Sequence, residues 1–268
     1  MKYRIFLLVT LSLAASAQSV DFKLRNNYLI LTKCSIADRQ DLVALIDTGV
    51  SETAIDAKLA ERLRLPLTAD TATFGTGQAA VSAVSIPDLT LGPVHVAELS
   101  GIAVDGSRIE RQLGVHADVI IGMDVLERSN LLIDYKAKTI TFGAAPQLTH
   151  TSPLILGKHL VLVPVLIGNR KLHLQLDTGL NGILIYGARI QTAQRSLNSS
   201  STTLIGGGSV QTASMPLQIG DWEQRQTTIA ITDDQPKGAP RFDGLLGPIA
   251  IGAHRLAFNW SKGTMRWE

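Results

Sequence analysis

Short runs of alternating apolar and polar residues make up most of the chain, and Gly, Pro, Asn and Asp separate them. Alternation with a period of two is typical of strands that bury one face. Helix signals are scarce. Asp56 can cap a short helix that runs to Arg64 and ends before Pro66, and a weaker pattern covers residues 188–194. The pattern therefore predicts a mainly β protein, with two small β-barrels as the expected architecture.

One alternating run occurs twice, and both copies end in Asp-Thr-Gly. Residues 42–49 recur as residues 172–179, at an offset of 130 residues (177 − 47). Two further matches follow in the same order at an offset of 125 residues (243 − 118): residues 118–122 with 243–247, and the hairpin-like residues 133–142 with 258–267. Three ordered matches indicate two homologous lobes.

The lobes are predicted to join near residues 144–153, where Pro and Thr interrupt the strand pattern. We expect an N-terminal lobe of residues 18–145 and a C-terminal lobe of residues 150–268.

The first 17 residues have the pattern of a secretory signal peptide. Lys2 and Arg4 precede an apolar run at 5–13, which is too short to span a bilayer, and small residues at 15–17 predict cleavage after Ala17. The only cysteine, Cys34, lies too far downstream to carry a lipid at the cleavage point. The sequence predicts an exported protein, periplasmic or extracellular, with no membrane anchor.

Charge and cysteine content narrow the function classes. Without the leader, 23 basic residues (25 − 2) balance 23 acidic residues, and no long basic run remains to neutralise a phosphate backbone. Nucleic acid is therefore not expected as a partner. One cysteine cannot form an internal disulfide, so the core must supply stability, and Cys34 is interpreted as an inert strand residue.

The repeated Asp-Thr-Gly turns are the candidate chemistry. One such turn is weak evidence, but a pseudo-two-fold axis between two lobes would bring Asp47 and Asp177 together. Two neighbouring carboxyl groups share one proton, so that one acts as general base and the other as general acid on a water molecule that attacks a carbonyl group. This chemistry needs no metal, cofactor or covalent intermediate.

Neighbouring residues fit the same geometry. Thr48 and Thr178 can hydrogen-bond across the axis, while Gly49 and Gly179 allow close approach of the backbone. Two segments of paired aliphatics and glycine can pack beside the turns: Ile120, Ile121 and Gly122, and Leu245, Leu246 and Gly247. Each segment taken alone is better interpreted as an ordinary core strand, and only the repetition favours a role beside the turns.

With these residues, the chain resembles the retropepsin-like and pepsin-like aspartic proteases, particularly the bacterial exported members that carry two retropepsin-like repeats in one polypeptide. The resemblance implies a bilobal acid-protease fold with a pseudo-two-fold axis, and an aspartic endopeptidase that acts on peptides or proteins as a monomer. It assigns catalysis to Asp47 and Asp177. It also implies a hairpin flap over the substrate, for which the candidates are Phe74, Gly75, Thr76 and Gly77 in the first lobe and Gly206, Gly207 and Gly208 in the second. A plain loop is the alternative at both places.

Motifs for other catalytic classes are absent from the sequence. There is no His-Glu-x-x-His, Gly-x-Ser-x-Gly, phosphate-binding loop or cysteine pair, and the six histidines show no metal-ligand spacing. Two alternatives remain: a catalytically inactive peptide-binding module that retains the fold, and a homodimeric active site, which two half-sites in one chain make unnecessary.

Overall fold

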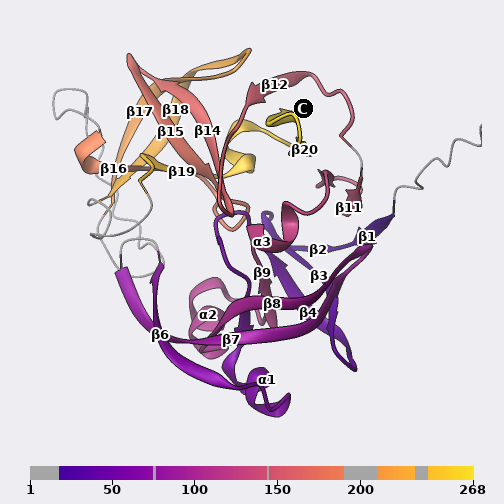
Figure 1. Ribbon diagram of the computed structural model, residues 1–268. Coiled ribbons are helices and arrows are strands. Elements are labelled where there is room, and N and C mark those ends of the chain that lie inside the picture. The colour runs from indigo at the N-terminus through magenta and orange to yellow at the C-terminus, as the bar shows by residue number, and fades with distance from the viewer. Residues whose placement is uncertain (1–17, 75–76, 144, 190–209, 233–240) are drawn as a thin grey trace, which may run out of the picture.

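The computed structural model describes residues 18–74, 77–143, 145–189, 210–232 and 241–268. Figure 1 shows two β-rich lobes, the first in indigo and purple and the second in pink, orange and yellow. The predicted fold class, a mainly β, bilobal acid-protease fold, is confirmed. No helix in the described ranges is long and apolar enough to cross a membrane.

The first lobe contains an eight-stranded sheet that closes on itself through an extra pairing of β3 with β7. Its strands, in spatial order, are β2 (Lys23–Arg25), β3 (Leu29–Ile36), β4 (Arg39–Ile46), β9 (Val119–Ile121), β5 (Ala54–Asp56), β8 (Val94–Val104), β7 (Gly77–Leu91) and β6 (Leu67–Phe74). The closure leaves β2 and β6 outside a ring of the other strands, which form a small barrel.

Within the residues that the structure describes, the second lobe repeats this order without a counterpart of β6. Its sheet consists of β13 (Ile155–Gly157), β14 (Leu160–Ile167), β15 (Arg170–Leu176), β19 (Gly244–Leu246), β16 (Ile183–Tyr186), β18 (Trp222–Thr232) and β17 (Gln211–Ile219). Pairing of β14 with β17 closes the barrel, as pairing of β3 with β7 does in the first lobe. The sequence repeat is therefore a repeat of strand order.

A third sheet joins the lobes. Its six strands are β1 (Ser19–Asp21), β11 (Thr139–Phe142), β10 (Leu131–Asp134), β20 (Arg255–Asn259), β21 (Thr264–Trp267) and β12 (His150–Pro153). At its centre, β10 of the first lobe pairs antiparallel with β20 of the second, and Leu132 faces Ala257. These two residues are equivalent in the repeat, so the pseudo-two-fold axis passes between them. The matched hairpins thus meet in one interlobe sheet.

Helices are short, as expected. Helix α1 (Ala57–Arg62) begins after Asp56, whose side chain accepts a hydrogen bond from Lys58 N, and it ends two residues before the predicted Arg64. Arg64 has φ 56°, a left-handed conformation that stops the helix. The other helical segments among the described residues are α2 (Gly106–Leu113), α3 (Met123–Leu126) and the 3₁₀ turns η1 (Gly187–Arg189) and η3 (Pro248–Ile251). Most of the predicted segment 188–194 lies outside the described residues.

The C-terminal end of strand β4 is buried on both faces of the sheet. Ala44 and Ile46 lie in the main hydrophobic core, whereas Leu45 points to the opposite side of the sheet. There it belongs to what we call the second apolar cluster, which consists of the buried residues Leu29, Leu45, Val115 and Ala117 and the partly buried Tyr28, Leu31, Leu113 and Ile120. Cys34 is buried with a free thiol, and burial raises its pKa to about 12, which fits the predicted inert strand residue.

Candidate active site

The two Asp-Thr-Gly turns follow equivalent strands, β4 and β15. Asp47 N donates a hydrogen bond to Ile121 O at 3.0 Å, and Asp177 N donates to Leu246 O at the same distance. Strands β9 and β19 run parallel to β4 and β15 and contain the paired aliphatic residues. The structure therefore places the segments 120–122 and 245–247 directly beside the two turns.

The two threonines connect the turns across the axis. Thr48 Oγ1 donates to Leu176 O at 3.0 Å and accepts from Thr178 N at 3.1 Å. Thr178 Oγ1 makes the mirrored pair with Ile46 O and Thr48 N, at 3.0 and 3.1 Å. Both side chains are almost fully buried, at 0% and 1% exposure. These four hydrogen bonds fix the relative position of the two turns.

Replacing Thr48 with Val is expected to destabilise the protein strongly. The change keeps the side-chain shape but leaves Leu176 O and Thr178 N without partners in a buried place, at about 1–3 kcal/mol for each lost partner. Urea unfolding followed by fluorescence measures the free energy of unfolding. Thr48→Ser, which keeps the hydroxyl group, is the control. Equal stability of the Val and Ser variants would show that these hydrogen bonds contribute little.

The two aspartates lie against each other at the axis. Asp47 Oδ1 accepts from Gly49 N at 2.8 Å, and Asp177 Oδ1 accepts from Gly179 N at 2.8 Å. The two carboxyl groups also hydrogen-bond to each other. Both residues remain partly exposed to solvent. The pair is thus supported from below by backbone N–H groups and open to a ligand on its other side.

The surroundings of the two carboxyl groups are unequal. Burial, followed by the charge of Asp47, raises the pKa of Asp177 well above its ordinary value, although a hydrogen bond from Gly179 N–H opposes the rise. Burial also raises the pKa of Asp47, but hydrogen bonds from Gly49 N–H, the Asp177 carboxyl and Gly179 N–H oppose this rise. These surroundings favour the protonated form of Asp177 over that of Asp47, and the pair as a whole shares one proton.

Only glycine fits after each threonine. A Cβ at position 49 would lie 2.6 Å from the Asp177 carboxyl carbon, and a Cβ at position 179 would lie 2.8 Å from Asp47 Oδ2. Neither distance is possible without a shift of the opposite carboxyl group. Each glycine therefore makes room for the aspartate of the other lobe.

A buried carboxylate that sequence reasoning missed supports the first turn only. Asp124, 3% exposed, accepts from Thr53 N at 2.8 Å and from Thr53 Oγ1 at 2.7 Å, and Thr53 Oγ1 accepts from Gly122 N at 3.1 Å. Burial raises the pKa of Asp124, although the hydrogen bonds from Thr53 oppose the rise. The equivalent position in the second lobe is Ile249, so the repeat itself gave no signal for this network.

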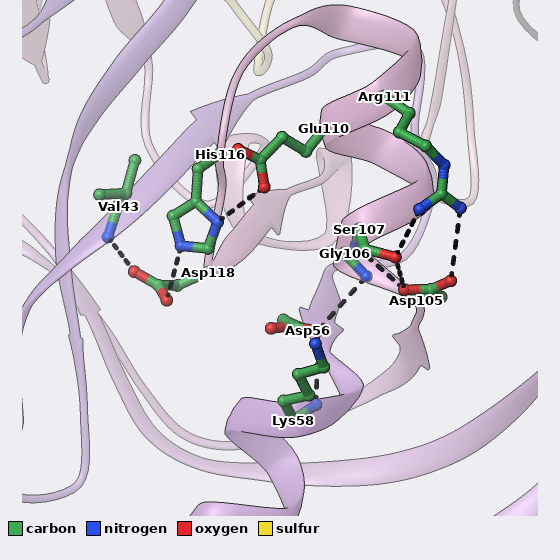
Figure 2. A network of polar contacts seen from close by, with 10 residues as sticks. All are labelled: Val43, Asp56, Lys58, Asp105, Gly106, Ser107, Glu110, Arg111, His116 and Asp118. Atoms are coloured by element: carbon green, nitrogen blue, oxygen red, sulfur yellow. Dashed lines mark hydrogen bonds and ion pairs between the residues drawn. The ribbon is translucent and has the colours of Figure 1, made fainter.

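The equivalent residues Asp118 and Asp243 anchor the strands beside the turns. Their Oδ2 atoms accept from Val43 N and His173 N, each at 2.8 Å. Figure 2 shows the surroundings of Asp118 in the first lobe. There, His116 lies between Asp118, at 3.3 Å, and Glu110 of α2, at 3.7 Å. Asp243 instead forms an ion pair of 2.8 Å with Arg189. The sequence repeat aligned Asp118 with Asp243 but did not indicate that each accepts a hydrogen bond from the strand that precedes an Asp-Thr-Gly turn.

The remaining polar contacts in Figure 2 hold the helices around this site. Asp56 Oδ1 accepts from Lys58 N at the start of α1 and from Gly106 N of α2, and Asp105 caps α2 through Ser107. Arg111 closes this group by donating to Ser107 Oγ at 3.0 Å.

Two further residues near the aspartates were missed from the sequence. Burial, and secondly the charge of Asp177, raises the pKa of Tyr28, so its phenol lies within the field of the pair. Gln175, 4% exposed, donates from Nε2 to Gly49 O of the other lobe at 2.9 Å. An alignment of the two sequence copies places Gln175 at the position of Leu45, and this difference could have identified Gln175.

The flap candidates are only partly described. Phe74 pairs with Gly77 at the end of the β6–β7 hairpin, which in Figure 1 extends from the first barrel in the direction of the second lobe. Gly75 and Thr76 lie outside the described residues, and so do Gly206, Gly207 and Gly208. Within the described ranges, no group of three or more His, Cys, Asp or Glu side chains is placed to hold a metal ion.

The family model of the aspartyl proteases matches residues 32–125 of the chain. A search of curated proteins found no match to the chain. The matched segment includes the first turn with Asp47, the strand β9 beside it and the buried Asp124. Over these residues, which carry one half of the paired-carboxyl geometry, the chain is similar to the aspartyl proteases.

Proposed function

We propose that the protein is an aspartic endopeptidase in which Asp47 is the general base and Asp177 the general acid. The similarity of residues 32–125 to aspartyl proteases supports an aspartic protease in general. The observation that carries the assignment is the pair of carboxyl groups that two equivalent turns hold against each other, each with a pKa raised by burial. Equivalent turns support both members, so each lobe supplies one half of the site.

The proposed reaction moves two protons. A water molecule bound by both carboxyl groups loses a proton to Asp47 as its oxygen attacks the peptide carbonyl carbon, and Asp177 donates its proton to the carbonyl oxygen. The tetrahedral diol then collapses: its C–N bond breaks, the amine nitrogen takes a proton from Asp47, and a hydroxyl proton returns to Asp177. The products are a carboxylic acid and an amine, and the pair ends in its starting protonation state.

We expect the pH dependence of kcat/KM to be bell-shaped, with its optimum at acidic to mildly acidic pH. Activity requires one proton on the pair. With increasing pH, activity rises as Asp47 ionises and falls as Asp177 loses its proton. The pKa of Asp177 lies well above its ordinary value. Initial rates of peptide cleavage across the pH range measure both limbs. Activity that increases steadily to alkaline pH would contradict a shared proton.

A digest of extended peptides at acidic pH tests the proposed activity directly. Mass spectrometry of the products should show cleavage within the peptides, not at their ends, because the site lies between two lobes. EDTA and serine-directed reagents should leave the rate unchanged, since neither a metal nor a serine takes part. Inhibition by EDTA would overturn the mechanism. An absence of cleavage under all conditions would favour the inactive peptide-binding module.

Several properties of the mature protein are proposed from the sequence. We propose that it is exported to the periplasm or the medium after removal of residues 1–17, which lie outside the described residues. Its lobes are proposed to span 18–145 and 150–268, and it is proposed to act as a monomer without a membrane anchor, with peptides or proteins as its partners. The β6–β7 hairpin is the proposed flap of the first lobe.

A further inference from the structure

The walls beside the two aspartates differ at one position. In the first lobe, Leu45 of β4 has Leu31 and Ile120 as its cross-strand neighbours. In the second lobe, the equivalent row consists of Leu162, Gln175 and Leu245. The flanking residues are aliphatic in both rows, and the central residue is a leucine in one row and a glutamine in the other.

The first-lobe row faces the same side of its sheet as Asp47. Side chains alternate along β4, with Ala44 and Ile46 in the main core and Leu45 on the opposite face, so the residue after Ile46 shares the side of Leu45. Tyr28 packs against this row. The second apolar cluster therefore borders the carboxyl pair, and Tyr28 and Ile120 keep part of their surface exposed.

The second-lobe row has the same orientation but a polar centre. Leu174 and Leu176 belong to the main core, so Gln175 points to the side of Asp177. Its Nε2 donates to Gly49 O. Among the described residues nothing donates to its Oε1, and this atom is not one of the fully buried unpaired polar atoms. One acceptor oxygen on the side of Asp177 therefore remains available to a ligand.

We propose that the two walls select different substrate side chains: the wall around Leu45 takes an apolar side chain, and the wall around Gln175 takes an uncharged side chain that donates a hydrogen bond to Oε1. This inference rests on the proposed function. An apolar side chain on the second wall would leave Oε1 without water or a partner, whereas a hydroxyl or amide group satisfies it. A site built to hydrogen-bond a substrate group discriminates strongly against analogues that lack that group. A charged group is disfavoured there because burial removes its hydration.

The test is a peptide-library digest that compares the wild type with Gln175→Leu, which makes the second row match the first. In the wild type, one side of the cut bond should prefer apolar residues and the other side Ser, Thr, Asn or Gln. Gln175→Leu should raise the ratio of apolar to polar preference about tenfold on the second side only. Gln175→Met, which keeps the length of the side chain without hydrogen bonds, should act in the same direction and serves if the Leu variant fails to fold.

The outcomes separate specificity from mere support of the turn. If Gln175 only holds Gly49 O, both variants lower kcat/KM for all peptides by the same factor and leave the preferences unchanged, which would overturn the inference. Equal preferences on both sides in the wild type would overturn it too. Cleavage that persists in Asp47→Asn would instead refute the proposed catalytic pair. A binding measurement tests the preference of the second wall without any catalysis. Peptides that carry either an apolar or a polar side chain at the position facing Gln175 are bound to the Asp177→Asn variant and to the Asp177→Asn, Gln175→Leu double variant, and their affinities are compared.

Discussion

Replacement of Asp47 by Asn is expected to lower kcat/KM for peptide cleavage on the order of 10⁴-fold, and Asp177→Asn should have a similar effect. An amide has nearly the shape of a carboxyl group, but it can neither accept the proton of the attacking water nor return one. The hydrogen bonds from Gly49 N and Gly179 N can still reach the amide oxygen, so the turns should keep their geometry. Initial rates with a peptide found in the digest measure the loss.

Stability measurements provide the control for this prediction, because loss of activity through misfolding must be excluded. The pKa of Asp177 is raised in the folded protein, so the wild type is progressively destabilised as pH rises from the ordinary value toward the raised one. Each unit of raised pKa corresponds to about 1.4 kcal/mol. Asp177→Asn removes this cost and should be more stable than the wild type at neutral pH, with the difference disappearing at strongly acidic pH. If Asp177→Asn were inactive but also unstable, the result would not support a catalytic role for Asp177. If Asp177→Asn remained active, the catalytic role would be disproved.

The second large effect is expected from Gly49→Ala. The new methyl group would lie 2.6 Å from the Asp177 carboxyl carbon, which is too close, so the carboxyl pair must separate. A displacement of about 1 Å in a catalytic group can cost about 10²-fold in rate, and here the shared proton is lost as well. We expect a fall in kcat/KM of about 10²-fold to 10⁴-fold, together with a changed pH profile, measured in the same peptide assay.

Gly157→Ala is the matched control for this substitution. Gly157 lies at the end of β13, its φ is not in the left-handed region, and an added Cβ would make contacts of 3.4 Å or more with Leu160. This variant should retain wild-type rates. If Gly49→Ala also kept the wild-type pH profile, the two carboxyl groups could not lie as close together as the structure places them.

The parts of the fold that recur in the sequence could be predicted. Because the repeat preserved strand order and turn residues, the alternation before Asp47 and Asp177 was enough to place two equivalent β lobes and to select the pair of aspartates. The short helix after Asp56 was predicted from its cap, which is a local signal. Its end was placed two residues too far, because the left-handed conformation of Arg64 leaves no mark in the apolar pattern.

The features that break the symmetry could not be predicted in the same way. Thr53 and Asp124 are 71 residues apart and meet only because β5 and β9 pair, so no local pattern links them. Leu45 occupied an apparently solvent-facing position of the alternation, since the second apolar cluster that covers it comes from distant segments. Gln175 fitted the polar half of the same alternation, and only its burial in the folded chain reveals it as unusual.

The interlobe sheet has a mechanical consequence. β10 and β20 form a continuous hydrogen-bonded ladder from Leu131 to Asp134, so the chain segment that links the two lobes is not the only connection between them. A substrate that requires a wider entrance cannot swing the lobes apart as independent bodies without tearing backbone pairs near the axis. Wider opening must come from twisting of this shared base or from bending of hairpins at the rim, and the floor that holds the aspartates would keep its spacing throughout.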